Sequence, residues 1–362
     1  MRRRVAIVYN EPRPSRYDGT GEEKAVLGVL DAVEAVHRAL LQLDFDAALV
    51  SLVPPLAQAK RKLSSLNTDL VFNLFEGFCG HPKTEALIPE ILSQAGITVT
   101  GCPGSMLRLA LDKAKMKMVL YAAGIPTPDF QLLDPETLHL FRLDYPCIVK
   151  PRGEDASLGI SGESVVNDFT ALERQVSLVS SCYSGGALVE EFLDGREFNA
   201  TVLGDSACTV LPVSEIAYFL PPGMPRILTF AAKWETDSLY FQDTSVVCPA
   251  DLEVEQRKRI AEIARAAFGL VGGRGYARVD MRMGEDGELN VIEVNPNPDI
   301  SPGTGAARQA EAAGMSYNQF IEEIVLLALD EKNNENQYSP DDLRRQTRHS
   351  ENAAQYPGIQ TL

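Results

Sequence analysis

The stretch VDMRMGEDGELNVIEVNPNPDISPGTG, residues 279–305, places carboxylate and amide side chains around one tight turn. The turn is predicted at residues 284–287 (GEDG), because its paired glycines separate two runs of alternating apolar residues, as in a β-hairpin. This turn sets a register of facing residues: Met283 with Glu288, Arg278 with Glu293, and Asp280 with Val291.

One face of this hairpin is predicted to gather polar side chains. Cross-strand partners point to the same side of a sheet and side chains repeat every second residue, so the shared face carries Arg278, Asp280, Glu293 and Asn295. Two carboxylates and an amide repel one another unless a positive charge joins them, and such hard oxygen ligands suit Mg²⁺ or Mn²⁺. The alternative is a simple ion pair between Arg278 and Glu293 on a solvated face.

Length and charge set the broad class of the protein. The chain has 362 residues, enough for two or three domains with sizeable cores. Its 50 acidic residues outnumber its 34 Lys and Arg residues, and the formal net charge is −16. Such a charge argues against nucleic acid or an anionic membrane as the main partner, although it permits a local basic pocket that binds phosphate.

The cysteines and the first residues indicate a compartment. None of the six cysteines forms a CxxC pair or a zinc-like spacing with the four histidines, so we expect buried free thiols in a reducing environment. The start, MRRRVAIVYNEP, predicts a first strand rather than a signal peptide, because the apolar run before Asn10 has only five residues. No run approaches the roughly 20 apolar residues of a membrane span. We therefore expect a cytoplasmic protein.

The chain divides into units by its pattern of elements. Residues 1–105 alternate strands (5–9, 46–50 and 69–75) with helices (25–43 and 84–96), which indicates a parallel sheet covered by helices. A second unit at 106–185 begins with one helix at 105–124 and has a strand at 145–151. A third unit at 186–330 opens with the strand ALVEEFL and closes with a helix. Residues 331–362 form a polar tail, predicted to be disordered or loosely docked.

A loop after Lys150 is a candidate phosphate site. Lys150 ends a strand and leads into RGEDASLGISG, whose glycines let backbone N–H groups approach phosphate oxygens. An ordinary hairpin connection would have the same pattern. Lys113 and Lys117 lie one helical turn apart, which is typical of a solvated helix face and also compatible with a ligand site.

A second candidate segment is ALVEEFLDGREFNATVL, residues 187–203. Glu190, Glu191 and Leu193 fall at a strand end, and Glu197 opens the next strand after an Asp-Gly turn. A carboxylate in this place can accept both hydroxyls of a ribose, and exposed backbone at a strand end can bind an adenine edge. The alternative is a plain hairpin with solvated acids.

Taken in order, these pieces resemble the ATP-grasp fold, and within it the D-alanine–D-alanine ligase family. The likeness runs from about residue 69 to residue 329. Its most specific parts are GCPGSMLRLALDKAKMKMVLYAAGIPTP, IVKPRGEDASLG, VEEFLDGREF, GRGYARVDMRM, and IEVNPNPDISP followed by AAGMSY. The resemblance implies an α/β fold, α+β in parts, in which a parallel-sheet N-terminal domain joins two α+β domains that clasp ATP.

The resemblance also implies a role for each matching residue. For the phosphates and metal, Lys113, Lys150 and Ser157 would hold ATP, and Asp280, Glu293 and Asn295 would bind two Mg²⁺ (or Mn²⁺) ions. For the nucleoside, Glu190 and Leu193 would frame the adenine with Glu191 beside them, Glu197 would bind the ribose, and Ile292 would pack under the base. The catalytic candidates are Arg278, as an oxyanion-stabilising cation, and Lys233, near the terminal phosphate.

The chain departs from the family pattern on the amino-acid side. The phosphate loop has Ala156 and Ser157 where the family has two serines, and Trp234 stands where the family has a tyrosine. The acidic motif that grips the first amino acid has no clean match, and Glu22 and Glu23 are nearby candidates.

Three further substitutions fall near the expected amino-acid site. NLFEGFCG replaces a histidine-glycine motif and leaves Glu76 as a substrate-binding candidate. Thr304-Gly305 replaces serine-leucine, and Asp299 replaces an oxyanion-binding glycine. Loss of a leucine wall at Gly305 should admit a larger acceptor, because a cavity opens where packing was.

The function implied is an ATP-dependent ligase that joins a carboxylate to an amine through an acyl phosphate. Its partners would be small amino-acid substrates, with a homodimer as the expected assembly. Strict D-alanyl-D-alanine synthesis and a ligase for a different amino acid or small metabolite both remain open. A nucleotide-binding regulatory module that no longer catalyses is the alternative from another class, against which the presence of Arg278 argues.

Overall fold

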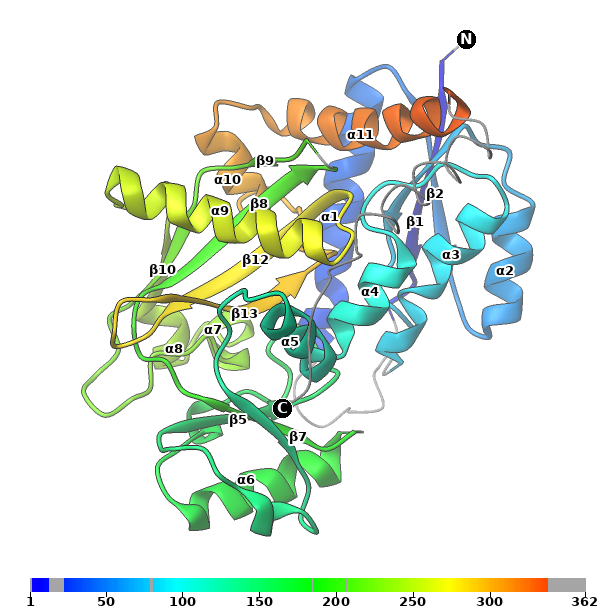
Figure 1. The fold of residues 1–362 in the computed structure, drawn as a ribbon. Helices are drawn as coiled ribbons and strands as arrows, with labels where there is room; N and C mark the ends of the chain where they lie inside the picture. The colour runs from blue at the N-terminus through cyan, green and yellow to red at the C-terminus, as the bar shows by residue number, and fades with distance from the viewer. Residues whose placement is uncertain (1, 13–22, 79–80, 184, 206, 338–362) are drawn as a thin grey trace, which may run out of the picture.

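The structure is a computed structural model that describes residues 2–12, 23–78, 81–183, 185–205 and 207–337. Its N-terminal part is a parallel sheet of order β2-β1-β3, formed by β1 (Arg4–Asn10), β2 (Asp46–Leu52) and β3 (Leu70–Leu74) (Figure 1). One face packs on α1 (Glu23–Gln42), and the other on α2 (Leu56–Ser64) and α3 (Leu87–Gln94). Alternate residues of β1 supply the two cores, which confirms the predicted helix-covered parallel sheet.

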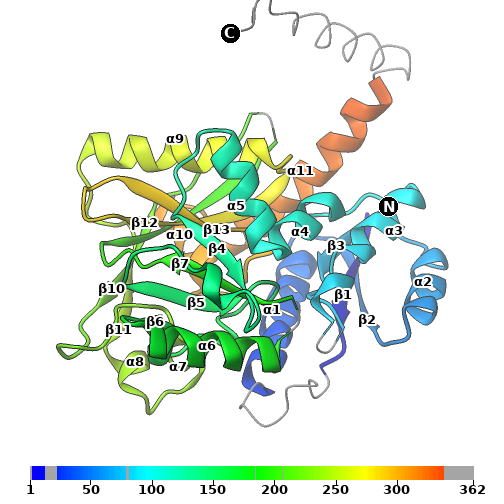
Figure 2. The same ribbon diagram turned by 60° about the horizontal axis from the view of Figure 1, so that its bottom comes forward.

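The second sheet is antiparallel and has the order β4-β7-β5-β6. Its strands are β4 (Phe130–Leu133), β5 (Cys147–Pro151), β6 (Val165–Val166) and β7 (Ala187–Glu191), and short 3-10 turns lie at Leu138–Leu140 and Gly162–Ser164. α6 (Phe169–Cys182) covers one face, as Figures 1 and 2 show. β7 was predicted to open the third unit, and that boundary is wrong because β7 pairs with β4 and β5.

The third sheet is antiparallel and carries the candidate metal ligands together with Arg278, Glu197 and Ile292. Its path is β11-β10-β8-β12-β13, formed by β8 (Glu197–Gly204), β10 (Ser214–Tyr218), β11 (Thr244–Val247), β12 (Gly275–Met283) and β13 (Leu289–Asn295), with β9 (Thr209–Val210) on β8. Between β10 and β11 run α7 (Phe230–Trp234) and α8 (Leu239–Gln242). α9 (Val254–Leu270) buries an apolar face at helical spacing against this sheet.

The predicted single helix at 105–124 is two helices, α4 (Gly104–Leu111) and α5 (Lys113–Ala122). Asp112 leaves helical geometry with φ −90° and ψ 86°, and its carboxylate accepts the Lys115 backbone N–H at 3.2 Å and two bonds from Arg152 at 2.8 and 2.6 Å. The helical period continued through this site, so periodicity did not reveal the break. Lys113 therefore stands in the first turn of α5, at its N-terminus.

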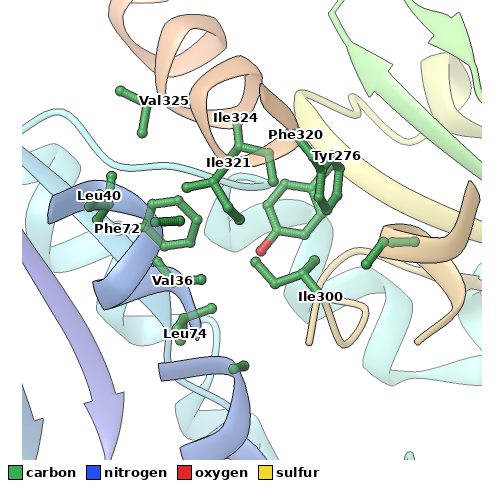
Figure 3. Packing of buried hydrophobic residues seen from close by; sticks show 14 of the residues in the cluster. Val36, Leu40, Phe72, Leu74, Tyr276, Ile300, Phe320, Ile321, Ile324 and Val325 are labelled. Carbon is green, nitrogen blue, oxygen red and sulfur yellow. The ribbon is translucent and has the colours of Figure 1, made fainter. Parts of the chain in front are cut away.

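The N-terminal and third sheets share one hydrophobic core, shown in Figure 3. Phe72 and Val36 from the N-terminal part meet Tyr276 of β12 and Phe320 of α11 (Tyr317–Gln337), and α10 (Gly305–Ala312) adds three alanines. These two regions are therefore packed into one body. α11 continues to Gln337, into the range predicted as tail, and residues 338–362 lie outside the described residues.

The prediction that the cysteine thiols are buried is correct for only some of the described cysteines. Cys102 and Cys147 are buried, Cys208 and Cys248 are half-buried, and Cys182 is exposed; Cys79 lies outside the described residues. Exposed Cys182 contradicts the expectation, because it ends α6 on its solvent side. Within the described ranges, no helix is both long and apolar enough to span a bilayer.

Candidate active site

The β12–β13 hairpin forms the predicted polar face, in a different register. Asp280 pairs with Glu293 and Arg278 with Asn295, whereas Met281 pairs with Val291, so a bulge leaves Ile292 without a partner. The predicted straight register, with Arg278 opposite Glu293, is wrong. The bulge shifts the alternation, so Val291 and Met281 turn into the core while the carboxylates of Asp280 and Glu293 lie on the opposite face of the hairpin. Without it, Val291 would lie among the polar side chains.

Each polar group on this face has a specific partner. Arg278 donates to both oxygens of Asp280 at 2.7 and 2.8 Å, and Asn199 Nδ2 donates to Asp280 Oδ1 at 2.7 Å. The expected alternative, an Arg278–Glu293 pair, does not form, because Lys113 Nζ lies 2.8 Å from Glu293 Oε1. Burial alone would lower the pKa of Arg278, but the neighbouring carboxylate of Asp280 raises it, so Arg278 stays charged.

The donor set fits a divalent cation that also binds phosphate. Asp280, Glu293 and Asn295 offer two carboxylates and one amide oxygen, and the Asn295 oxygen accepts the Asn297 N–H at 2.9 Å. In the part of the chain that the structure describes, no three His, Cys, Asp or Glu side chains form a metal centre of their own. A cation here would therefore complete its shell with other oxygens, as Mg²⁺ does with nucleotide phosphates. Both carboxylates already hold a cationic side chain.

Lys113 is buried, which contradicts a solvated helix face. It is 8% exposed, and its Nζ contacts Asp155 at 2.9 Å, Glu293 at 2.8 Å and the Glu154 carbonyl at 2.7 Å. Burial would lower its pKa, but Asp155 and Glu293 raise it. Burial would also raise the pKa of Glu293, but Lys113 outweighs this effect and holds it well below its usual value. Lys113 thus links the loop after β5 to the polar face of the β12–β13 hairpin.

Lys117 is also buried and belongs to a second charge cluster. Its Nζ lies 3.4 Å from Glu190 Oε2 and donates to Thr127 Oγ1 at 2.8 Å, while Lys150 Nζ lies 2.9 Å from Glu190 Oε1. Burial lowers the pKa of Lys117 to about 8, because the attraction of Glu190 offsets only part of the desolvation. Glu190 pairs with Ile148 on β5, two residues from Lys150, so Lys150 reaches it diagonally across the same face of the sheet, which the hairpin prediction for 187–203 did not foresee.

The loop after Lys150 connects an antiparallel pair, β5 and β6, so the hairpin alternative is correct as topology. Its conformation is nonetheless specialised, because Ala156 and Ser157 both have positive φ, 54° and 61°. Ser157 Oγ donates to the Leu228 carbonyl at 2.8 Å, and Phe230 N donates to the Ile160 carbonyl at 3.1 Å. These bonds fasten the loop to the segment that leads into α7.

α7 carries Lys233, the second catalytic candidate. Its ammonium has no hydrogen-bond or ion-pair partner among the described residues, and burial together with Arg278 lowers its pKa. A half-buried lysine that forms no direct ion pair can contact a phosphate group. Its neighbour Trp234 packs on α1, where a Cβ added to Gly28 would lie 3.3 Å from the indole. The helix that holds Lys233 therefore touches the N-terminal domain.

The nucleoside candidates cluster around the turn between β7 and β8. Leu193 and Glu197 are buried, Ile292 is half-buried in the bulge, and Glu191 is exposed. Sequence reasoning missed Arg282, whose Nη1 lies 3.4 Å from Glu197 Oε2. The sequence did contain a signal for Arg282, because it follows Arg278 and Asp280 at every second position along β12 and so lies on the same face.

The amino-acid candidates lie on loops beside this face. Glu76 directly follows β3, where desolvation and then the charge of Asp299 raise its pKa to about 7. Thr304 caps α10, and its hydroxyl donates to the Ser301 carbonyl at 2.7 Å. A Cβ on Gly305 would lie 3.9 Å from Arg278 Cδ. Glu23 begins α1, whereas Glu22 lies outside the described residues.

Known proteins resemble this chain in sequence. The family profile described as D-ala D-ala ligase C-terminus matches residues 119–326. The uncharacterized protein y4sG of Sinorhizobium fredii is 33% identical over 259 residues, 72% of this chain and 74% of that protein. A D-alanine–D-alanine ligase of Xanthomonas axonopodis pv. citri is 31% identical over 314 residues, 85% of this chain and 91% of that one.

A solved structure gives the fold. The D-alanine–D-alanine ligase from Bacillus anthracis complexed with ATP superposes with a TM-score of 0.70 at 18% identity, over 92% of this chain and 99% of that one. The ATP-grasp architecture predicted from the motif order is confirmed. Since the profile spans more than half of the chain and the relatives align over most of it, the chain belongs to the D-alanine–D-alanine ligase family of ATP-dependent enzymes that form a C–N bond.

Proposed function

We propose that this enzyme activates the carboxylate of one amino acid with ATP and joins it to the amine of a second, with D-alanine as the first substrate to test. The observation that carries the proposal is the convergence of Arg278, Lys113 and Lys233 with two carboxylates at one end of the third sheet. Three cations around a carboxylate pair suit a site where a phosphoryl group is transferred and negative charge develops.

The phosphate side of the site assigns roles to four residues. Lys113 and Lys150 contact the ATP phosphates, Ser157 holds the phosphate loop, and Lys233 approaches the terminal phosphate. The substrate carboxylate oxygen attacks the γ-phosphorus, and ADP leaves. The amine then attacks the acyl carbon, Arg278 stabilises the oxyanion, and phosphate departs with the carboxylate oxygen.

Asp280, Glu293 and Asn295 would hold two Mg²⁺ ions, which neutralise charge on the phosphates. To bind them, Asp280 has to give up its ion pair with Arg278, and Glu293 has to give up its ion pair with Lys113. Both changes release a cation for the substrates, so the contacts in the structure are compatible with the assigned roles.

The nucleoside lies at the turn between β7 and β8 in this proposal. Glu190 and Leu193 frame the adenine, with the Glu191 backbone at its edge, and Ile292 packs under the base. Glu197 accepts the ribose hydroxyls. The burial of Leu193 and Glu197 supports this assignment, because a solvated hairpin would leave both exposed.

The amino-acid side uses Glu76 and Glu23 for the first ammonium, and Thr304 and Gly305 for the acceptor. Gly305 has ordinary helical geometry and no side chain beside Arg278, which favours an acceptor larger than alanine. A ligase of the same chemistry for a different amino-acid pair is therefore the second candidate. Family membership favours either ligase over a non-catalytic ATP-binding module.

For the protein as a whole we propose a cytoplasmic homodimer made of the units 1–105, 106–185 and 186–330, with β7 moved to the second unit. Size-exclusion chromatography with light scattering tests the dimer: a mass near 79 kDa, twice the 39.6 kDa chain, supports it, and a monomer refutes it.

The test of function is phosphate release from MgATP with D- and L-amino acids, singly and in pairs, followed by mass spectrometry. We expect release only with amino acids present, and an amide that accounts for the phosphate. ATP binding without amide formation across the panel would point to the non-catalytic module.

A further inference from the structure

Arg282 is a buried arginine that the assigned chemistry leaves unused. It is 5% exposed, and it lies directly opposite Glu197 in the β8–β12 pairing. Partners in this pairing share one face of the sheet, so the guanidinium and the carboxylate meet on the face that the proposed function assigns to the nucleoside. Their closest atoms, Arg282 Nη1 and Glu197 Oε2, are 3.4 Å apart.

The rest of the guanidinium is held by backbone. Arg282 Nε donates to the Gly195 carbonyl at 3.3 Å, and Nη2 donates to the Arg226 carbonyl. A Cβ on Gly195 would lie 2.4 Å from the Met283 carbonyl oxygen, so only glycine lets this turn lie so close to the end of β12. Arg282 thereby joins the β7–β8 turn to the segment that leads into α7.

Two aromatic rings flank the same cation. The guanidinium carbon lies 5.2 Å from the centre of the Phe192 ring and 5.8 Å from that of Tyr218. Such packing fixes a planar guanidinium in one orientation. A surface arginine would instead keep its head group in water.

Tyr218 is the second residue that holds the Glu197 carboxylate. Its hydroxyl donates to Glu197 Oε2 at 2.8 Å, the same oxygen that faces Arg282. Burial and then the charge of Glu197 raise the pKa of Tyr218 well above its usual value, so the phenol keeps its proton. The other oxygen, Oε1, has no hydrogen-bond partner among the described residues, although Glu197 is only 5% exposed.

We propose that Arg282 and Tyr218 are positioning residues for the nucleotide: they hold Glu197 Oε2, so that the carboxylate presents Oε1 to the ribose hydroxyls. The inference rests on the proposed role of Glu197 in binding ribose. A carboxylate held in advance loses less freedom on binding, and therefore binds hydroxyls more tightly than a mobile one. The chain thus discriminates ribose from deoxyribose through residues that do not touch the sugar.

The test compares the dissociation constants of MgATP and Mg-2′-deoxy-ATP by calorimetry, which needs no knowledge of the amino acids. Tyr218→Phe removes one hydroxyl, and Arg282→Met keeps an unbranched chain between the two rings. We expect the wild type to prefer ATP about tenfold or more, and both variants to reduce that preference to about threefold or less. In a Glu197→Gln background neither change should lower the preference further.

Arg196→Met is the matched control. Arg196 precedes Glu197, pairs with Glu215 at 2.7 and 2.6 Å, and packs 5.0 Å from the Phe198 ring. Like Arg282, Arg196 pairs with a glutamate and packs on an aromatic ring, but it does so away from Glu197. Its loss should therefore leave the sugar preference unchanged.

Three results contradict the proposal in different ways. If the variants weaken both nucleotides equally, Arg282 and Tyr218 serve the fold alone, and the positioning role is wrong. If Arg196→Met lowers the preference as much, the effect is a general one of losing an arginine. If the wild type itself does not distinguish the two nucleotides, the ribose role of Glu197 in the proposed function is wrong. Should Arg282→Met fail to fold by circular dichroism, the isosteric Tyr218→Phe decides the matter.

Discussion

The proposed nucleotide side and the proposed amino-acid side of the site are built differently. Asp280, Glu197 and Glu190 stand on strands, are at most 6% exposed, and each has a charged partner. Glu76 and Asp299 stand on loops and are exposed, and Glu76 has no side-chain partner among the described residues. Strands fix a side chain by pairing and packing, whereas a loop residue can change without disturbing a core. The nucleotide side is therefore constrained by the fold, and the amino-acid side is where substrate choice can vary.

The largest expected effect concerns the constrained side. Glu293→Gln replaces a proposed metal-binding carboxylate with a neutral amide of the same shape, so we expect turnover to fall more than about 100-fold with the fold retained. Phosphate release and circular dichroism measure the two properties. Glu288→Gln is the control, because Glu288 is exposed in the same hairpin. Normal activity in Glu293→Gln would remove Glu293 from the site.

The next effect separates the two sides directly. Glu197→Gln weakens the acceptor for the ribose hydroxyls, so we expect the KM for ATP to rise by roughly 10- to 100-fold, equivalent to about 1.5–3 kcal/mol for a hydrogen bond to a charged group. The KM values of the amino acids should stay nearly unchanged. Steady-state kinetics measure both. Equal increases in all KM values would mean that the sides are not independent.

The third effect tests the variable side. Gly305→Leu restores a wall beside Arg278, so preference should shift toward small acceptors by about tenfold or more in the ratio of kcat/KM values. Gly305 begins α10 with φ outside the positive range, so leucine fits its backbone. The KM for ATP should not change. If the acceptor ratio stays constant, the acceptor binds elsewhere.

The smallest effect is a pH dependence of stability. Desolvation and then the charge of Asp155 raise the pKa of Glu85 from 4.5 to about 8. Between these values the folded state keeps a proton that the unfolded state loses, so the contribution to stability is complete below pH 4.5 and is lost as pH rises toward 8. Glu85→Gln cannot lose a proton, so it removes this pH-dependent loss of stability, and its amide oxygen can still accept the hydrogen bond from Asn297.

Thermal unfolding from pH 5 to 8.5 measures this effect. We expect the Tm of Glu85→Gln relative to the wild type to increase with pH. A difference that is independent of pH would show that Glu85 titrates normally.

Much of the architecture followed from local patterns. The buried strands of residues 4–74, the polar face of β12 and β13, and the order of the ATP-grasp motifs were all accessible to sequence reasoning. The bulge at Ile292 was not, because alternation fixes the faces of a strand but not its register across a turn. The break at Asp112 was hidden by an unbroken helical period.

The burial of charged residues was the other limit. Lys113 and Lys117 have the spacing of a solvated helix face, and only their tertiary partners Glu293 and Glu190 explain why both are buried. Arg282 was missed for the same reason, since an arginine in a strand is ordinarily assigned to solvent. These partners come from strands far away in the sequence.

One isotope experiment tests the central claim, carboxylate–amine ligation through an acyl phosphate, most directly. The donor amino acid is labelled with ¹⁸O in its carboxylate, and the phosphate released from unlabelled MgATP is analysed by mass spectrometry. Attack by the carboxylate on the γ-phosphate moves one carboxylate oxygen to phosphorus, so the account predicts one ¹⁸O in each phosphate that accompanies an amide. Unlabelled phosphate, formed at the same rate as the amide, would contradict the account.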